Sequence, residues 1–259
     1  MSGVDLGENF QLENAPIIEA VIDIDCDMPP AFDLARGEDS ARGTFAEDYP
    51  NLKKAFRVHH EVIARLNEPP QLTAMQALQA LQFFSGDSAQ LVQVRTNGYS
   101  FNRLRPYSSL DDYLPEIERT WRLFVELAQP VRVRRIAMRY INRILLPIET
   151  GSVELNQYLS LGPNLPEDHR LTYLGFLNQY SAIEPLTQNA ITITLTTQPV
   201  EQAQLPIIFD IESRREFSAE PTDWDALRDI ILSLRRLKNR VFKQTLSNEC
   251  LKLFQKSDR

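Results

Sequence analysis

Arginine side chains form the most chemically specific pattern in this sequence. Within 131–147, Arg135, Arg139 and Arg143 recur at even spacing, so they share one face of a predicted strand. Guanidinium groups bind carboxylates and phosphates through paired hydrogen bonds. We therefore predict an anion-binding site at Arg135, Arg139 and Arg143, joined by Arg95 and Arg103 from a neighbouring hairpin.

The same arginines also have a structural explanation. They can pair with internal acids such as Glu118, Asp210 or Glu212, or lie on a solvated sheet face, and this explanation is the favoured one. Tyr140 and Asn142 lie on the opposite face of the strand, which they share with apolar residues such as Ile136. A buried Asn needs hydrogen-bond partners, so we expect these two residues to organise the core.

Three histidines are the other candidates for acid–base or metal chemistry. His59 and His60 fall on a predicted helix, where adjacent side chains point about 100° apart, and no third ligand is suitably spaced. His169 lies in a Pro-rich loop. We predict no metal site and no cofactor. An acidic row is interpreted as a solvated strand face; it comprises Glu19, Asp23, Asp25 and Asp27.

Catalytic motifs are missing from the sequence. It contains no G-x-S-x-G, no P-loop and no dinucleotide-binding glycine pattern, so we name no catalytic residue. A basic run at 235–240 can contact phosphate, but helical spacing favours a solvated helix face.

Composition limits the class of protein. The chain has 259 residues, of which 43% are hydrophobic and 24% charged, as in folded globular proteins. A formal charge of -7 does not favour nucleic acid as the partner. Cys26 and Cys250 indicate neither a disulfide framework nor a zinc site. The chain start lacks signal-peptide features, and no apolar stretch is long enough to span a membrane, so we expect a cytoplasmic protein without a membrane partner.

Periodicity predicts the elements that must position these residues. Strands are expected at 17–25, 78–84, 90–96, 99–104, 131–147, 171–183, 190–197 and 205–214. Helices are expected at 51–67, from Asp111 or Asp112 to 125, at 153–159 and from 222 to 241, with Ser247 capping a last turn. Asn97-Gly98 predicts a hairpin with a type I′ turn.

The predicted fold class is α+β, with antiparallel sheets and helices packed on one face. The element order β-α-β-β-β-α is repeated from Ile136, which suggests two halves, 1–130 and 131–259, or one continuous domain. A duplication predicts two antiparallel sheets, each backed by its own helices.

Three segments carry a resemblance to a known family. They are Asn14-Ala15-Pro16-Ile17-Ile18-Glu19-Ala20, Pro106-Tyr107 and Arg139-Tyr140-Ile141-Asn142. With these segments the chain resembles a sporadically distributed family of uncharacterised bacterial proteins, from about Asn14 to the final helix. The resemblance implies an accessory gene of the kind found in mobile elements, toxin–antitoxin-like loci and defence islands.

The sequence thus favours a non-enzymatic binding or interaction protein that engages an acidic partner or an anionic ligand through its arginine-bearing sheet face. A protein partner and a homodimer both agree with this hypothesis. One alternative is an enzyme for phosphorylated substrates, with the same arginines as an anion clamp and Glu19 or His60 as base. Another is a nucleic-acid-binding protein, which steep salt dependence of association would identify.

Overall fold

The computed structural model describes residues 12–63, 71–148, 151, 153–162 and 174–255. Its strands are β1 (Ile17–Asp27), β2 (Asn51–Ile63), β3 (Gln71–Phe84), β4 (Gln90–Arg95), β5 (Gly98–Leu104), β6 (Arg132–Pro147), β7 (Leu177–Glu184), β8 (Asn189–Thr197) and β9 (Gln204–Ala219). Its helices are α1 (Glu38–Phe45), α2 (Leu110–Ala128), α3 (Leu155–Tyr158), α4 (Trp224–Thr245) and α5 (Asn248–Lys252).

The strands form one continuous antiparallel sheet in the order β2-β3-β4-β5-β1-β6-β9-β8-β7. The α+β prediction is confirmed, but the expectation of two separate sheets is wrong. The reason is the central pair: β1 bonds along its whole length to β6, in a register that sets Asp25 beside Arg135 and Val21 beside Arg139. This pairing fuses the two halves of the chain through their backbones.

The two halves nevertheless have matching internal arrangements. In the first, strands lie in the order β3-β4-β5-β1, and in the second they lie in the order β7-β8-β9-β6. Each half closes with a long helix, α2 or α4, and the first half carries one additional strand, β2. The expected repetition of element order therefore has a spatial counterpart, while common ancestry of the halves stays a prediction.

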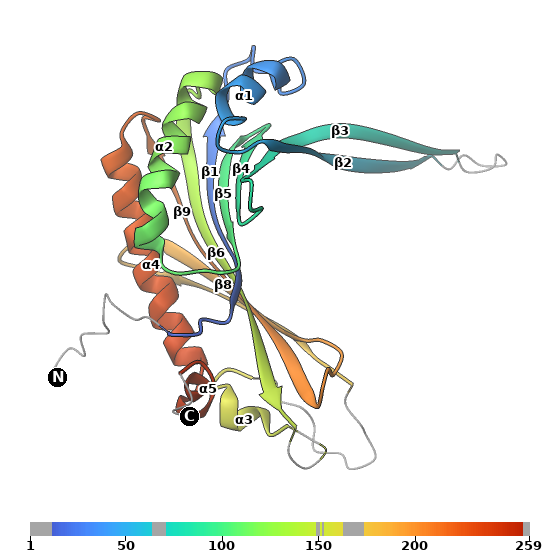
Figure 1. Cartoon of the computed structure of the whole chain (residues 1–259), viewed down its shortest axis with the longest axis vertical. Coiled ribbons are helices and arrows are strands. Elements are labelled where there is room, and N and C mark those ends of the chain that lie inside the picture. The colour runs from blue at the N-terminus through green and yellow to red at the C-terminus, as the bar shows by residue number, and fades with distance from the viewer. Residues whose placement is uncertain (1–11, 64–70, 149–150, 152, 163–173, 256–259) are drawn as a thin grey trace.

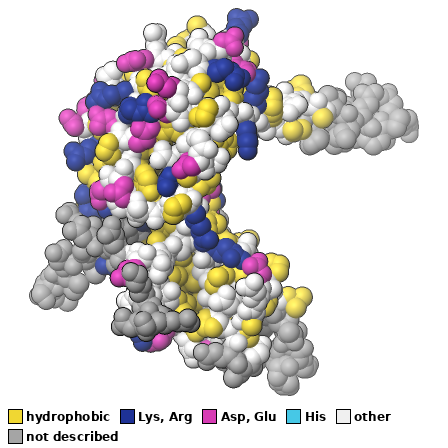
Figure 2. Space-filling view, in the orientation of Figure 1, with side chains coloured by type: hydrophobic (Ala, Val, Ile, Leu, Met, Phe, Trp, Pro, Cys, Tyr) yellow, Lys and Arg dark blue, Asp and Glu magenta, His cyan; other side chains and the backbone are white. Residues whose placement is uncertain are grey.

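Helices α2 and α4 cover the same side of the sheet, and the opposite side is open and concave (Figure 1). The space-filling view shows the resulting hollow between the projecting β2–β3 ribbon and the lower end of the molecule (Figure 2). None of the described helices is both long and apolar enough to cross a membrane.

Aromatic side chains dominate the core under the helices. Trp121 and Phe124 of α2 pack on Tyr99 of β5, with ring centroids 5.6 and 5.7 Å away. Phe242 of α4 stacks on Phe209 of β9 at 5.4 Å. Burying one such ring contributes about 2 kcal/mol. Because α2 and α4 bury apolar stripes on neighbouring parts of the sheet, they fix its curvature and its open face.

The helix predicted at 51–67 is wrong, because 51–63 is strand β2. Among its described side chains, at 51–58, none is fully buried, and Phe56, Arg57 and Val58 are all exposed, so burial there does not set one face of the strand apart from the other. The chance spacing of its apolar residues resembles a helix instead. Pairing with β3 from Asn51↔Phe84 to Ile63↔Gln71 overrides that local pattern.

Helix α2 begins earlier than predicted. Ser109 is its N-cap and accepts a hydrogen bond from the Asp112 amide at 3.4 Å, so Pro115 lies inside the helix. Leu110 is buried and anchors the first turn against the core. That apolar anchor, together with the serine cap, places the start before the aspartates.

The predicted hairpin is confirmed, but its turn differs. Thr96 and Asn97 form the turn, and Gly98 pairs with Arg95 as the first residue of β5. Only Gly98 has a positive φ here, 144°. A Cβ atom on Gly98 would lie 2.1 Å from the Ile24 carbonyl oxygen, so glycine is required by the close approach of β1.

The remaining predicted elements are present, but several ends differ: β3 begins at Gln71 and not at 78, and β9 continues to Ala219 and not only to 214. Strand β6 buries Ile136, Met138 and Tyr140 on one face and leaves Arg139 exposed on the other, as the alternation predicts. Residues 171–173 of one predicted strand lie outside the described residues, and the strand is seen from Leu177. Cys26 and Cys250 are free and buried, and burial raises the pKa of each thiol to about 12.

Candidate functional site

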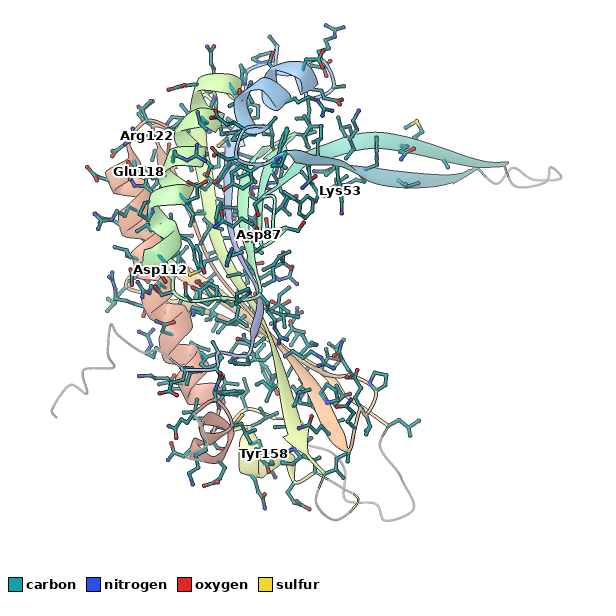
Figure 3. All side chains as sticks on the ribbon, in the orientation of Figure 1. Lys53, Asp87, Asp112, Glu118, Arg122 and Tyr158 are labelled. Atoms are coloured by element: carbon teal, nitrogen blue, oxygen red, sulfur yellow. The ribbon has the colours of Figure 1, made fainter. Side chains whose placement is uncertain are left out.

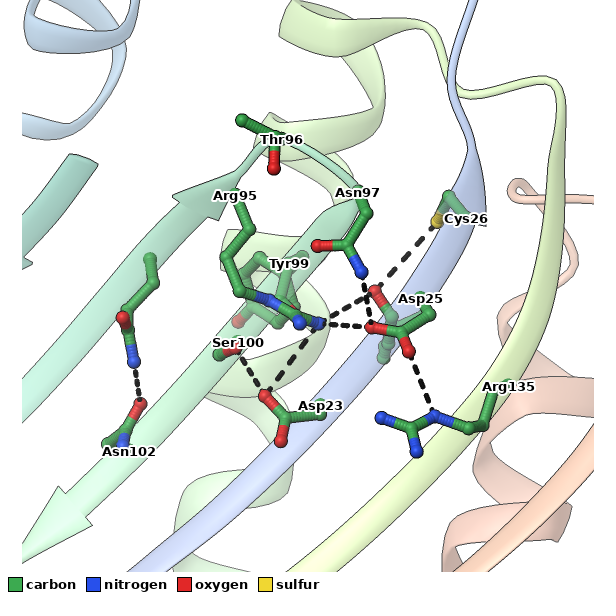
Figure 4. Close-up of polar contacts among 12 residues, drawn as sticks. Asp23, Asp25, Cys26, Arg95, Thr96, Asn97, Tyr99, Ser100, Asn102 and Arg135 are labelled. Carbon is green, nitrogen blue, oxygen red and sulfur yellow. Dashed lines mark hydrogen bonds and ion pairs between the residues drawn. The ribbon is translucent and has the colours of Figure 1, made fainter. Parts of the chain in front are cut away.

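Two of the predicted arginines meet at one aspartate of the central strand (Figure 4). Arg95 Nη2 lies 2.7 Å from Asp25 Oδ1, and Arg135 Nε lies 2.8 Å from Asp25 Oδ2. Arg95 also donates to the Tyr99 carbonyl oxygen at 2.9 Å and lies 3.7 Å from a carboxylate oxygen of Asp23. Asp25 is buried, so it was wrong to interpret this acidic row as a solvated face. These acids of β1 hold the arginines of neighbouring strands.

Arg139 and Arg143 form separate ion pairs further along β6. Arg139 Nε lies 2.9 and 3.0 Å from the two carboxylate oxygens of Asp210, and this contact raises the pKa of Arg139. Arg143 Nη2 lies 2.6 Å from Glu201 Oε2, while its Nε donates to Gln198 at 3.1 Å. Both arginines thus have carboxylate partners within the chain.

Arg103 belongs to the helix-bearing side of the sheet. Its guanidinium group stacks 4.8 Å from the centre of the Tyr113 ring of α2 and donates two hydrogen bonds to the Pro106 carbonyl oxygen, at 2.9 and 3.1 Å. The five predicted residues therefore do not converge on one site. Four of them pair with internal acids, which is the structural explanation that the sequence already favoured.

Of the acids considered as partners, Asp210 takes that role. Glu118 instead pairs with Arg122 on α2 at 2.6 Å (Figure 3), and Glu212 pairs with Arg214 at 3.2 Å. Glu19 accepts a hydrogen bond from Asn102 at 2.6 Å. The side chains of His59 and His60, and all of His169, lie outside the described part of the chain.

A different site forms where three sequence segments meet. A pocket is lined by Pro16 and Ile17 at the start of β1, by Tyr107 before α2, and by Tyr140 and Asn142 of β6. These residues belong to the three segments singled out in the sequence, at 14–20, 106–107 and 139–142. Helix α4 closes the pocket from the other side. The cavity volume is about 70 Å³, which has room for about two water molecules at their volume in the liquid.

Lys238 of α4 is the most unusual residue in this pocket. It is 9% exposed, and its Nζ atom lies 3.8 Å from the centre of the Tyr140 ring. Within the residues that the structure describes, Nζ makes no hydrogen bond and no ion pair. Burial, with a smaller contribution from the nearby Arg235 charge, lowers the pKa of Lys238 to about 7. The face of the Tyr140 ring opposes this lowering of the Lys238 pKa, because it attracts the protonated amine.

Arg235 lines the pocket one helical turn before Lys238. Its two terminal nitrogens lie 2.6 and 2.8 Å from the carboxylate oxygens of Asp111 at the start of α2. This paired contact raises the pKa of Arg235 and lowers that of Asp111. Arg235 therefore has its own counter-ion, which leaves Lys238 as the cation without one among the described lining residues.

Two tyrosines form the polar wall beside Lys238. The Tyr107 and Tyr140 hydroxyls are hydrogen-bonded at 2.8 Å, and their rings meet edge to face at 5.5 Å. Burial raises the pKa of Tyr140 to about 12 and that of Tyr107 well above its usual range. Both hydroxyls consequently keep their protons near neutral pH.

Asn142 lines the same pocket and carries an unsatisfied acceptor. Its Nδ2 donates to the carbonyl oxygens of Phe209 at 2.9 Å and Tyr140 at 3.3 Å, which fixes the orientation of the amide. The side chain is 1% exposed, and its Oδ1 has no hydrogen-bond donor among the described residues. Asn142 is buried as expected, but half of its hydrogen-bonding capacity is unused.

Sequence reasoning missed Lys238, because it treated 235–240 as a solvated helix face. The signal was nevertheless present: Lys238 lies four residues after Leu234 and four before Phe242, so it continues the buried stripe of α4. A lysine on the apolar stripe of a helix is the pattern that would have identified it.

Taken together, the pocket offers a desolvated cation, two hydroxyls and a carbonyl acceptor in a small volume. Such a set can hold a compact anion that also carries a hydrogen-bond donor. Neither protein-family models nor curated proteins give a match to this chain.

Proposed function

We propose that this chain is a binding protein for a small anionic ligand, which occupies the pocket between β1, β6 and α4. This keeps the binding role expected from the sequence and moves its site from the arginine-bearing sheet face to the pocket. The observation that carries the proposal is Lys238, which is buried without an acidic partner among the described residues.

The charge of the ligand follows from the cost of burying an amine. A buried lysine is normally paired, and an unpaired one loses several kcal/mol of hydration. An anion bound in the pocket compensates for the lost hydration of the amine and accepts a charge-assisted hydrogen bond from it. Arg235 adds positive potential, although Asp111 offsets much of it.

The second feature of the ligand follows from Asn142. Its unused Oδ1 accepts hydrogen bonds only, so it favours a ligand that bears a hydroxyl or amino group near its anionic group. The volume restricts the ligand to a few non-hydrogen atoms. Small hydroxy acids satisfy all three requirements.

Calorimetric titration with glycolate, acetate and inorganic phosphate tests the proposal. We expect glycolate to bind more tightly than acetate, because only glycolate offers a donor to Asn142. We expect Lys238→Met to weaken glycolate binding at least tenfold. Affinity should be highest below pH 7 and fall as Lys238 loses its proton above that pH.

A matched control separates the two candidate sites. The combined variant Arg135→Ala, Arg139→Ala and Arg143→Ala changes the sheet face and leaves the pocket intact, so it should bind glycolate as the wild type does. Loss of binding in that variant alone would return the site to the sheet face. Absence of binding by all three probes, or equal binding by Lys238→Met, would refute the pocket proposal.

A further inference from the structure

Lys238 has the surroundings of a nucleophile as well as those of a cation. Its amine lies in a pocket instead of at the surface, and no described carboxylate holds its proton in place. Near neutral pH, the lowered pKa leaves a substantial fraction of the amine uncharged. An uncharged amine can attack a carbonyl carbon, whereas an ammonium group cannot.

The wall beside Lys238 suits the product of such an attack. An imine that takes up a proton carries a positive charge on the former lysine nitrogen. The Tyr140 ring lies 3.8 Å from that nitrogen and attracts a cation whether it is an ammonium or an iminium group. A carboxylate on the ligand itself supplies the counter-charge that the described residues do not provide.

The pocket also contains groups for the proton transfers. Loss of water from the addition product requires a proton on the departing oxygen, and the hydrogen-bonded hydroxyls of Tyr107 and Tyr140 remain protonated near pH 7. Asn142, which lines the pocket, has an Oδ1 atom that is buried and lacks a donor among the described residues, so an acceptor is left unsatisfied beside the site of that addition product.

From this arrangement we propose that the pocket captures a small oxo acid covalently, as an imine on Lys238. This inference rests on the proposed function and specifies its ligand class. In the reaction, the lysine nitrogen forms a bond to the carbonyl carbon, and the carbonyl oxygen leaves as water after accepting two protons, in total, from the amine and its surroundings. No oxidant or reductant is consumed.

Reductive trapping with glyoxylate provides the test. Glyoxylate has the size of glycolate and carries an aldehyde, and borohydride reduces any imine to a stable carboxymethyl group on the lysine. Intact-mass measurement followed by peptide mapping should find one adduct, on Lys238. Glycolate in excess should protect Lys238, because it occupies the same pocket without a carbonyl group.

Lys252 is the matched control within the same chain. Its side chain is 63% exposed and its amine pairs with the Glu249 carboxylate, so it is accessible but has an acidic partner, which Lys238 lacks among the described residues. Adducts distributed equally over Lys252 and Lys238 would overturn the inference, because exposure alone would then explain the labelling. Failure to label Lys238 under conditions where glycolate binds would also overturn it.

One variant separates failure of this inference from failure of the proposed function. Lys238→Arg keeps a permanent positive charge but cannot form an imine, so it should bind glycolate and show no adduct. If the arginine does not fit the pocket, protection of wild-type Lys238 by glycolate decides the same question. Glycolate binding without any adduct leaves the anion site standing and removes the covalent step.

Discussion

The Nζ atom of Lys238 lies over the face of the Tyr140 ring, 3.8 Å from its centre, and so joins helix α4 to the central strand β6. The contact places a protonatable amine in the buried layer between the helix and the sheet. Its energetic consequences depend on pH, and they can be measured without knowledge of any ligand.

Lys238 should reduce stability at low pH. In the unfolded chain the lysine pKa is 10.5, whereas in the folded protein it is about 7. Between these values the unfolded state binds more protons than the folded state, so the free energy of unfolding rises with pH. The stability lost through Lys238 is therefore greatest below pH 7. Lys238→Met should therefore stabilise the protein by on the order of 5 kcal/mol at pH 6.

Urea denaturation at pH 6 and pH 10 checks this prediction. The advantage of Lys238→Met should shrink as the pH approaches 10.5, because the lysine is then uncharged in the folded state and is losing its proton in the unfolded state as well. A variant less stable than the wild type at pH 6 would show that the contact with Tyr140 outweighs the cost of burying the charge.

The tyrosine pair should contribute modestly and cooperatively. Tyr107→Phe and Tyr140→Phe each remove one member of the 2.8 Å hydroxyl contact and leave the rings in place, so each should destabilise the fold by about 1 kcal/mol. The double variant should lose less than the sum of the two. Additive losses in a double-mutant cycle would mean that the hydroxyls act independently.

The arginines of the sheet face should differ in their structural importance. Arg135→Ala leaves buried Asp25 with one fewer partner and should cost about 1–3 kcal/mol. Arg132→Ala is the control, because that side chain is 54% exposed beside Asp27 and should cost less than about 1 kcal/mol. Equal losses in thermal or urea unfolding would contradict the assignment of Asp25 as a structural acid.

Gly98 should tolerate no side chain. Gly98→Ala forces a Cβ atom against the Ile24 carbonyl oxygen at a positive φ, so we expect a loss of more than about 3 kcal/mol. Gly86→Ala is the matched control, since nothing lies within 4 Å of its Cβ position. Similar unfolding free energies for the two variants would disprove the close approach of β1 and β5.

The β2–β3 ribbon should be dispensable for the stability of the body. β4 pairs with β3 only from Ala80 to Phe84, and the outer part of the ribbon projects away from the sheet (Figure 1). Replacing 57–77 by an Asn-Gly turn should change the free energy of unfolding by less than about 1 kcal/mol, because the side chains described in that range, at 57–58 and 74–77, are exposed and contribute little burial. A large loss on urea unfolding would show that the ribbon supports the core.

The sequence predicted strands well where one face is buried. Strand β6 alternates because Ile136 and Met138 enter the core while Arg135 and Arg139 do not, and that contrast is readable from residue types alone. β2 has no such contrast, because Phe56 and Arg57 are both exposed. Its conformation is set by pairing with β3, which local periodicity does not encode.

The partners of the arginines could not be predicted for a related reason. Asp25 and Arg135 are 110 residues apart, and they meet only because the β1–β6 register aligns them. The sequence placed Asp210 among the possible partners of the arginines, but residue types alone gave no reason to prefer it to Glu118. Lys238 was readable in principle, since helical spacing alone places it with Leu234 on the inner side of α4.

The central pairing of β1 with β6 also affects how the chain is made. β1 lies near the N-terminus, and β6 is completed only at Pro147, so synthesis must pass the middle of the chain before the two can pair. Until then, the emerging half presents a row of unpaired backbone amides and carbonyls, which can associate with other nascent chains.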